Sequence, residues 1–180
     1  MFNLKHLLLI VGFCFVGCAS PSPSTFEYAY EPRIDWPEDE YRTVSQWQGS
    51  NEVTGQAFLR TRGGDVKTGA GSEVILNPVT SYSTQFVDAI IRKTHGHGVK
   101  LTPELPDARI NDIFRIQTAD AEGRFAFSGV PEGDYYLYST VTWESPSVYG
   151  SGLQMQGGWV FTKIQVSSEK ANKHILNQSY

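Results

Sequence analysis

Apolar and polar residues alternate through much of the chain after residue 50, and this period of two predicts short β-strands. Phe125 and Phe127 alternate with non-apolar residues, as the inner face of a half-buried strand does. The residues that share one side of their predicted strands are Val53, Gly55, Ala57 and Leu59; Val74 and Leu76; Phe114, Ile116 and Thr118; Phe125 and Phe127; Tyr135, Leu137, Val141 and Trp143; and Val160, Ile164 and Val166.

Two tight turns are predicted between Thr118 and Leu137. Asp120 can accept hydrogen bonds from backbone N–H groups two residues on, and Gly123 can adopt a positive φ that closes a hairpin. Pro131 presets φ for a second turn, in which Gly133 tolerates a left-handed backbone. Turns this close together require adjacent antiparallel strands and exclude a helix.

The strand pattern is interrupted between residues 81 and 110, where an insertion with a short helix is predicted. Phe86, Ala89 and Ile90 recur at helical spacing, and Ser83 or Thr84 is placed to cap the helix. Glycines at positions 96 and 98 are expected to end it.

About seven short strands with frequent turns predict an all-β fold, a β-sandwich. The Gly- and Ser-rich stretch from Ser145 to Gly158 is predicted to be a loop. A last edge strand is predicted at His174–Leu176.

The first 17 residues predict an export signal. Lys5 supplies a positive charge, and the apolar run of ten residues from Leu7 to Val16 is shorter than the roughly 20 that span a bilayer. The run ends at Gly17 and Cys18, which resembles the lipobox of bacterial lipoproteins, whose cysteine is lipidated with chains such as palmitate. The alternative is an ordinary secretory signal with Cys18 as an incidental thiol.

Lipidation of Cys18 implies attachment to the outer membrane, because Ala19 rather than aspartate follows the cysteine. The protein would then face the periplasm or the cell surface. No disulfide is expected, since Cys14 leaves with the signal and Cys18 carries lipid.

The chain therefore divides into a lipoprotein signal peptide at 1–17, a tether and aromatic-acidic approach segment at 18–50, and a sandwich domain at 51–180 with the insertion at 81–110. Ser20–Ser24 reads as a flexible spacer. The rest of the approach segment is too aromatic for a disordered linker, so we expect Trp36 and Trp47 to pack along the domain. A binding role for such rings in solvent is the alternative.

The domain resembles the carboxypeptidase regulatory-like domains, which have a transthyretin-like (prealbumin-like) seven-strand β-sandwich. The resemblance covers roughly residues 52–143 and implies a fold rather than an activity, because such domains are accessory modules in proteins of many functions. Ala119 and the long 81–110 insertion depart from the family pattern. The matching positions are Gly55, Ala70, Val74, Leu76, Thr118, Asp120, Gly123, Phe125, Phe127, Pro131, Gly133, Tyr135 and Leu137. Type VI secretion lipoproteins, which also join a lipid anchor to such a sandwich, remain a minor alternative.

Composition argues against several functional classes. The formal net charge is −4, without the clustered basic face that nucleic-acid binding requires, so no nucleic-acid partner is expected. No serine stands in a nucleophile-elbow pattern, and Gly63-Gly64 lacks the lysine of a phosphate-binding loop. The carboxylates Asp120/Glu122 and Glu132/Asp134 lie in predicted turns and are interpreted as turn residues. The sequence therefore predicts no catalytic residue, no enzyme and no cofactor.

His95 and His97 form the most suggestive polar pair. Two imidazoles at i and i+2 of an extended segment point to one side and suit Zn, Cu or Ni. The alternative is a solvated turn after the helix.

An aromatic face is the second candidate site. By strand parity, Tyr136 and Tyr138 lie opposite the Tyr135/Leu137 face, and Trp159 and Phe161 lie opposite Val160/Ile164. Exposed, these four rings would form a patch suited to a carbohydrate or a protein. The alternative is that the insertion or the N-terminal segment covers them.

The function expected from the sequence is that of a non-catalytic lipoprotein of the cell envelope. It would be held on the membrane by its lipid anchor and present a β-sandwich as a binding or structural module to an envelope protein or a carbohydrate. The alternative function is a metal-binding or enzymatic accessory lipoprotein that uses the His95/His97 loop.

Overall fold

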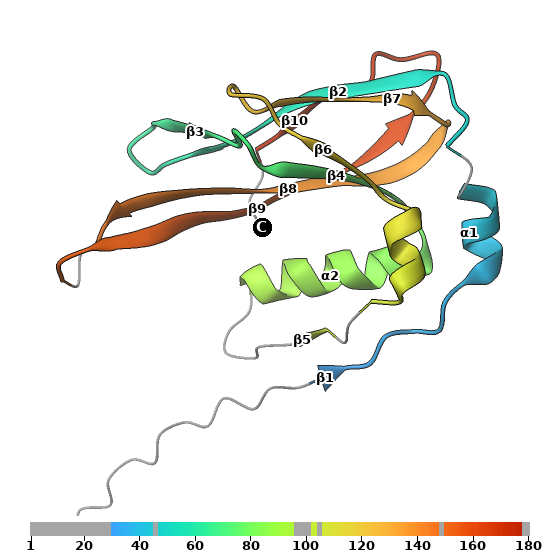
Figure 1. The fold of residues 1–180 in the computed structure, drawn as a ribbon, viewed down its shortest axis with the longest axis horizontal. Helices are drawn as coiled ribbons and strands as arrows, with labels where there is room; N and C mark the ends of the chain where they lie inside the picture. The colour runs from blue at the N-terminus through green and yellow to red at the C-terminus, as the bar shows by residue number, and fades with distance from the viewer. Residues whose placement is uncertain (1–29, 45–46, 96–101, 104–105, 148–149, 178–180) are drawn as a thin grey trace, which may run out of the picture.

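Two four-stranded sheets pack face to face, and a helix lies on the outer side of one of them (Figure 1). The computed structural model describes residues 30–44, 47–95, 102–103, 106–147 and 150–177. In the first sheet, β2 (Asn51–Arg60) pairs with β10 (Lys173–Leu176), β3 (Val66–Thr68) and β7 (Arg124–Val130). The second sheet has the order β6 (Arg115–Thr118), β4 (Glu73–Pro78), β8 (Gly133–Pro146) and β9 (Leu153–Val166). The remaining elements are β1 (Tyr30–Glu31), which pairs with β5 (Thr102–Pro103), α1 (Glu38–Val44), α2 (Ser81–His95) and η1 (Ala108–Asp112).

The hydrophobic core lies between the two sheets. It is built from the inward positions of most of the predicted strands, and the all-β, sandwich-like class is thereby confirmed. The face predicted for Phe114, Ile116 and Thr118 is the exception, because Ile116 is 43% exposed and Phe114 packs on another cluster. The buried core residues are Val53, Ala57, Leu59, Val74, Leu76, Ala119, Phe125, Phe127, Val130, Tyr135, Leu137, Val141, Val160, Ile164, Val166 and Leu176. Burial of this apolar area is the main contribution to stability.

α2 starts earlier and is longer than the sequence predicts. The cap is Thr80, rather than Ser83 or Thr84, because Thr80 Oγ1 accepts from the Ser83 N–H (3.1 Å) while Ser83 Oγ accepts from the Thr80 N–H (2.8 Å). These reciprocal bonds form a capping box with serine in place of the usual glutamate. α2 therefore runs for 15 residues, and its buried Val87 packs on the outer face of the second sheet.

The segment before the sandwich packs against it through tryptophans, as predicted. Trp47 Nε1 donates to the Ile113 carbonyl (2.9 Å), and its ring stacks on Tyr135 at a centroid distance of 5.7 Å. Trp36 stacks on Tyr41 at 4.1 Å, in a second cluster beside α2. Tyr41 belongs to α1, a helix that the sequence analysis did not predict.

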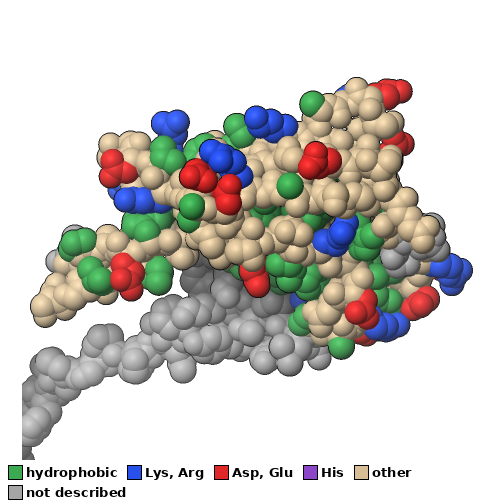
Figure 2. All heavy atoms as spheres, turned by 45° about the horizontal axis from the view of Figure 1, so that its top comes forward, with side chains coloured by type: hydrophobic (Ala, Val, Ile, Leu, Met, Phe, Trp, Pro, Cys, Tyr) green, Lys and Arg blue, Asp and Glu red, His purple; other side chains and the backbone are tan. Residues whose placement is uncertain are grey.

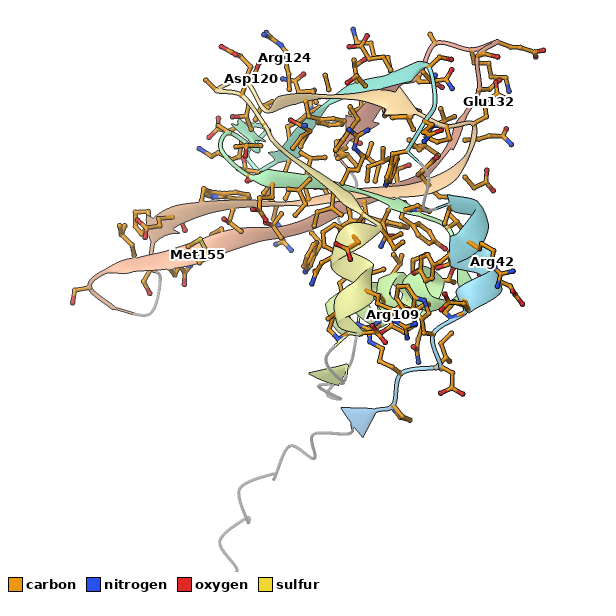
Figure 3. All side chains as sticks on the ribbon, turned by 45° about the vertical axis from the view of Figure 1, so that its right-hand side comes forward. Arg42, Arg109, Asp120, Arg124, Glu132 and Met155 are labelled. Atoms are coloured by element: carbon orange, nitrogen blue, oxygen red, sulfur yellow. The ribbon has the colours of Figure 1, made fainter. Side chains whose placement is uncertain are left out.

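The stretch predicted as a loop at Ser145–Gly158 is instead mostly strand. β8 continues to Pro146 and β9 begins at Leu153, so the two strands form a ribbon that projects beyond the sandwich (Figure 1). On this part of β9, Leu153 and Met155 are 64% and 65% exposed. Met155 is labelled on the ribbon in Figure 3. The strand was missed because its pairing uses backbone groups, without a core to impose an apolar pattern.

Within the described residues, no helix is long and apolar enough to cross a membrane. The predicted signal peptide and Cys18 lie outside the described part of the chain.

Candidate binding pocket

The outer face of the second sheet is aromatic and lies beneath α2. β4 buries Val74 and Leu76 in the sandwich core and therefore presents Ile75 and Asn77 to the other side. β8 presents Tyr136 and Tyr138 to that same outer side, 7% and 4% exposed, and β9 presents Trp159 and Phe161. This face is a second, smaller packing surface between sheet and helix.

A cavity of about 150 Å³ remains on this face, where α2, η1 and the N-terminal segment come together over the sheet. We call it the α2 pocket. Its walls are predominantly apolar and come from the N-terminal segment, α2, residues 106–114 and three strands of the second sheet. The lining residues are Arg33, Ile75, Asn77, Tyr82, Ser83, Phe86, Pro106, Ile110, Phe114, Tyr138 and Trp159.

Asn77 carries an unsatisfied polar atom in this apolar setting. The residue is 3% exposed, and its Nδ2 donates to the hydroxyl of Tyr138 over a long 3.4 Å. Its Oδ1 has no hydrogen-bond partner; among the buried side-chain nitrogen and oxygen atoms of the described residues, only Nε2 of His174 shares this condition. Buried polar groups are nearly always paired in proteins, so this position departs from ordinary packing.

The two side chains joined by this hydrogen bond, Asn77 and Tyr138, are neutral. Burial raises the pKa of the Tyr138 phenol, while its hydrogen bond with Asn77 acts in the opposite direction. Tyr138 therefore stays protonated at neutral pH and keeps a hydroxyl that can donate.

Arg33 brings the N-terminal segment to the α2 pocket. Its guanidinium lies 5.0 Å from the centre of the Tyr82 ring and 5.3 Å from that of Phe86, within cation–π range. The amide of Gln85 holds the segment in place: Nε2 donates to the Pro32 carbonyl (2.9 Å), and Oε1 accepts from the Ile34 N–H (3.2 Å). Arg33 is thus positioned by contacts on both sides of it.

The wall formed by η1 is fixed by Asp107. Its backbone N–H donates to the Tyr82 hydroxyl (2.6 Å), and its Oδ1 accepts from the Arg109 N–H (3.0 Å). The guanidinium of Arg109 pairs with this carboxyl at 2.8 Å and lowers its pKa to about 2. Arg109 also lies over the Trp36 ring at 4.7 Å, which links η1 to the N-terminal segment (Figure 3).

The aromatic residues chosen from the sequence lie together, but two of them are covered. Tyr138 and Trp159 line the α2 pocket, whereas Tyr136 bonds Thr84 Oγ1 (3.0 Å) and packs near Phe161 beneath the helix. Tyr136 and Tyr138 are buried beneath α2, as the alternative interpretation had it, whereas Trp159 and Phe161 are only partly buried. What remains open to a ligand is the cavity beside them.

The predicted metal pair falls largely outside the described residues. His95 is the last residue of α2, and its side chain and the whole of His97 lie outside the described part of the chain. Among the residues that are described, no three His, Cys, Asp or Glu side chains form a group able to hold a metal ion.

The turn carboxylates serve the backbone. Asp120 Oδ1 accepts from the N–H groups of Glu122 (3.0 Å) and Arg124 (2.7 Å) at the β6–β7 turn (Figure 3). Glu132 Oε1 accepts from the Ser168 N–H (2.9 Å). On the face seen in Figure 2, acidic and basic side chains are interspersed rather than gathered by sign.

Sequence reasoning missed Asn77, Arg33, Tyr82 and Phe86 as pocket residues. Only Asn77 carried a signal, as a polar residue on a strand whose other outward residue is Ile75.

No family model matches the chain, and no curated protein matches it. Among solved structures it is similar to a crystal structure from Pseudomonas aeruginosa, described as that of a "putative carbohydrate binding protein". The two chains are 28% identical, with a TM-score of 0.68, over 81% of this chain and 99% of the other. They share the fold over nearly the whole length of that protein.

Proposed function

We propose that the protein is a non-catalytic carbohydrate-binding module and that its ligand enters the α2 pocket. The observation that carries the proposal is a cavity walled by the rings of Tyr138, Trp159 and Phe86 on the outer face of the sandwich. The similarity to the Pseudomonas protein supports the ligand class.

The chemistry of the pocket suits a sugar. A sugar ring has apolar C–H faces, which pack on aromatic rings, and a polar edge of hydroxyl groups, which needs a few placed hydrogen-bond partners. A cavity of about 150 Å³ accommodates a benzene ring. A sugar ring is larger, so one terminal ring would fill the pocket and leave its outer edge in the opening.

We further propose that Cys18 anchors the module in the outer membrane. This rests on the lipobox-like end of the N-terminal apolar run and the Ser/Pro spacer that follows it. The mass of the mature N-terminal peptide tests it: an acylated Cys18 is expected, and an unmodified thiol would contradict the anchor.

The domain class is also a proposal. The Gly, Pro and aromatic positions of Thr118–Leu137 support a transthyretin-like sandwich of the carboxypeptidase regulatory-like kind. Domains of this kind are accessory modules, which agrees with a binding role.

Titration of the purified protein with monosaccharides, followed by NMR, tests the binding function. Trp159→Ala is expected to weaken binding about tenfold or more, because buried aromatic rings dominate recognition energies. Trp143→Ala is the matched control: it also removes a partly buried tryptophan that does not line the pocket. Equal effects of the two replacements in folded variants would place binding elsewhere.

A further inference from the structure

Asn77 is out of place in the surface it helps to form. Its neighbours in the interface between sheet and helix are aromatic or aliphatic, including Ile75 on its own strand and Tyr136 opposite it on β8. A leucine or valine would pack here without the unsatisfied Oδ1, and the only hydrogen bond it would remove from Tyr138 is the long one from Nδ2. A residue that breaks the local packing rule in this way is the kind found at functional sites.

The amide has one end occupied and one end open. The Tyr138 hydroxyl accepts a hydrogen bond from Nδ2, and Oδ1 has no partner. Because Asn77 lines the α2 pocket, a ligand there can supply the partner. The two ends of a carboxamide have nearly the same shape, and exchanging them would leave Nδ2 open instead. A hydroxyl group satisfies either end, because it both donates and accepts.

The pocket also disfavours a charge at this depth. A carboxylate cannot donate to Oδ1, and burying it among apolar walls is costly. The cation that lines the pocket, Arg33, lies over the rings of Tyr82 and Phe86. Burial raises the pKa of the Tyr138 phenol and the positive charge of Arg33 opposes this rise, so the charge of Arg33 acts on the floor, although the side chains of Asn77 and Tyr138 themselves carry no charge.

We infer that Asn77 is the specificity-determining residue of the α2 pocket, and that it selects an uncharged sugar ring through one hydroxyl group at the pocket floor. This inference rests on the proposed carbohydrate binding and narrows it to a neutral class of ligand. The ring face lies against the aromatic walls, and Tyr138 positions the amide.

A thermodynamic cycle between this residue and the ligand tests the inference. The full-length protein is titrated with glucose, galactose, mannose, N-acetylglucosamine and glucuronate, and then with single-deoxy forms of the tightest neutral binder. In the wild type, removal of one hydroxyl is expected to weaken binding about tenfold or more, because a site built for a hydroxyl rejects the analogue without it. In Asn77→Leu, that deoxy sugar and its parent should bind alike.

A stability measurement separates recognition from a structural role. Asn77→Leu should unfold at the same temperature as the wild type or higher, because the gain from removing the unpaired Oδ1 offsets the loss of the long hydrogen bond to Tyr138. Asn177→Leu, at an exposed position after β10, is the matched control and should leave binding unchanged. If the leucine variant does not fold, Asn77→Val, which suits a strand, takes its place in the cycle.

Two results would overturn the role of Asn77 but leave the proposed carbohydrate binding intact. The first is that the Asn77 variant discriminates against the deoxy sugar as strongly as the wild type, and the second is that glucuronate binds most tightly. The absence of binding to any sugar of the panel would overturn the proposed function as well.

Discussion

At the scale of single residues, Gly123 connects a turn to the neighbouring sheet. Its φ is +77°, and a Cβ added to it would lie 2.5 Å from the Ala57 carbonyl oxygen. Its own carbonyl accepts from the Ala57 N–H (2.8 Å). The sequence predicts the turn and its positive φ, but it could not reveal the contact with β2, which depends on a residue far away in the chain.

Replacement of this glycine tests the contact. Gly123→Ala is expected to reduce the free energy of unfolding by about 3 kcal/mol, the combined cost of a left-handed alanine and of overpacking. Gly64→Ala is the control, since Gly64 has a φ of +95° but open space around it, and about 1 kcal/mol is expected. Urea unfolding measures both, and equal losses would mean that the close approach to Ala57 does not matter.

Because of His174 on β10, we expect the stability of the fold to depend on pH. Burial lowers the pKa of its imidazole below the usual 6.5, and its Nε2 has no partner. The unfolded chain then binds a proton more readily than the folded one, so stability falls as the pH drops below about 6.5.

The comparison of the wild type with His174→Gln isolates this effect. The wild type should lose more stability between pH 7 and pH 5 than the variant, as followed by urea unfolding at both values. Parallel losses would exclude His174 as the cause.

At the scale of elements, the strands of the core were predictable and the elements around it were less so. Val53 and Leu76 reveal their strands because one side of each is buried. The ribbon end at Leu153 has no such constraint, and β3 is only three residues long. The start of α2 depends on reciprocal bonds between Thr80 and Ser83, which are visible only in three dimensions.

A substitution at Val87 tests whether α2 packs on the second sheet. Val87 is 2% exposed and packs on Tyr136 and Tyr138. Val87→Ala should reduce the free energy of unfolding by about 2 kcal/mol, from lost burial and the cavity left behind. Ile175→Ala, at an exposed position on β10, should stay within about 0.5 kcal/mol. Similar small effects at both sites, measured by urea unfolding, would show that α2 does not pack on the sheet.

At the scale of the whole molecule, the candidate site lies outside the sandwich core, between the second sheet and the insertion. Figure 1 shows α2 of this insertion on the outer side of that sheet. Strand parity places Tyr138 and Trp159 on the same face of the second sheet, so the part of the site that the sheet contributes could be predicted. Arg33 and Phe86 could not, because they come from segments whose position on the sheet is not set by any periodic pattern. The cavity itself arises from the way these segments meet.

The indole N–H signals of the four tryptophans offer the most direct test of binding at this pocket. Addition of the sugar that binds most tightly should shift the signal of Trp159, which lines the pocket. The signal of Trp47, whose Nε1 donates to Ile113, should stay in place. A sugar that shifts Trp36 or Trp143 and leaves Trp159 unchanged would contradict the α2 pocket as the carbohydrate site.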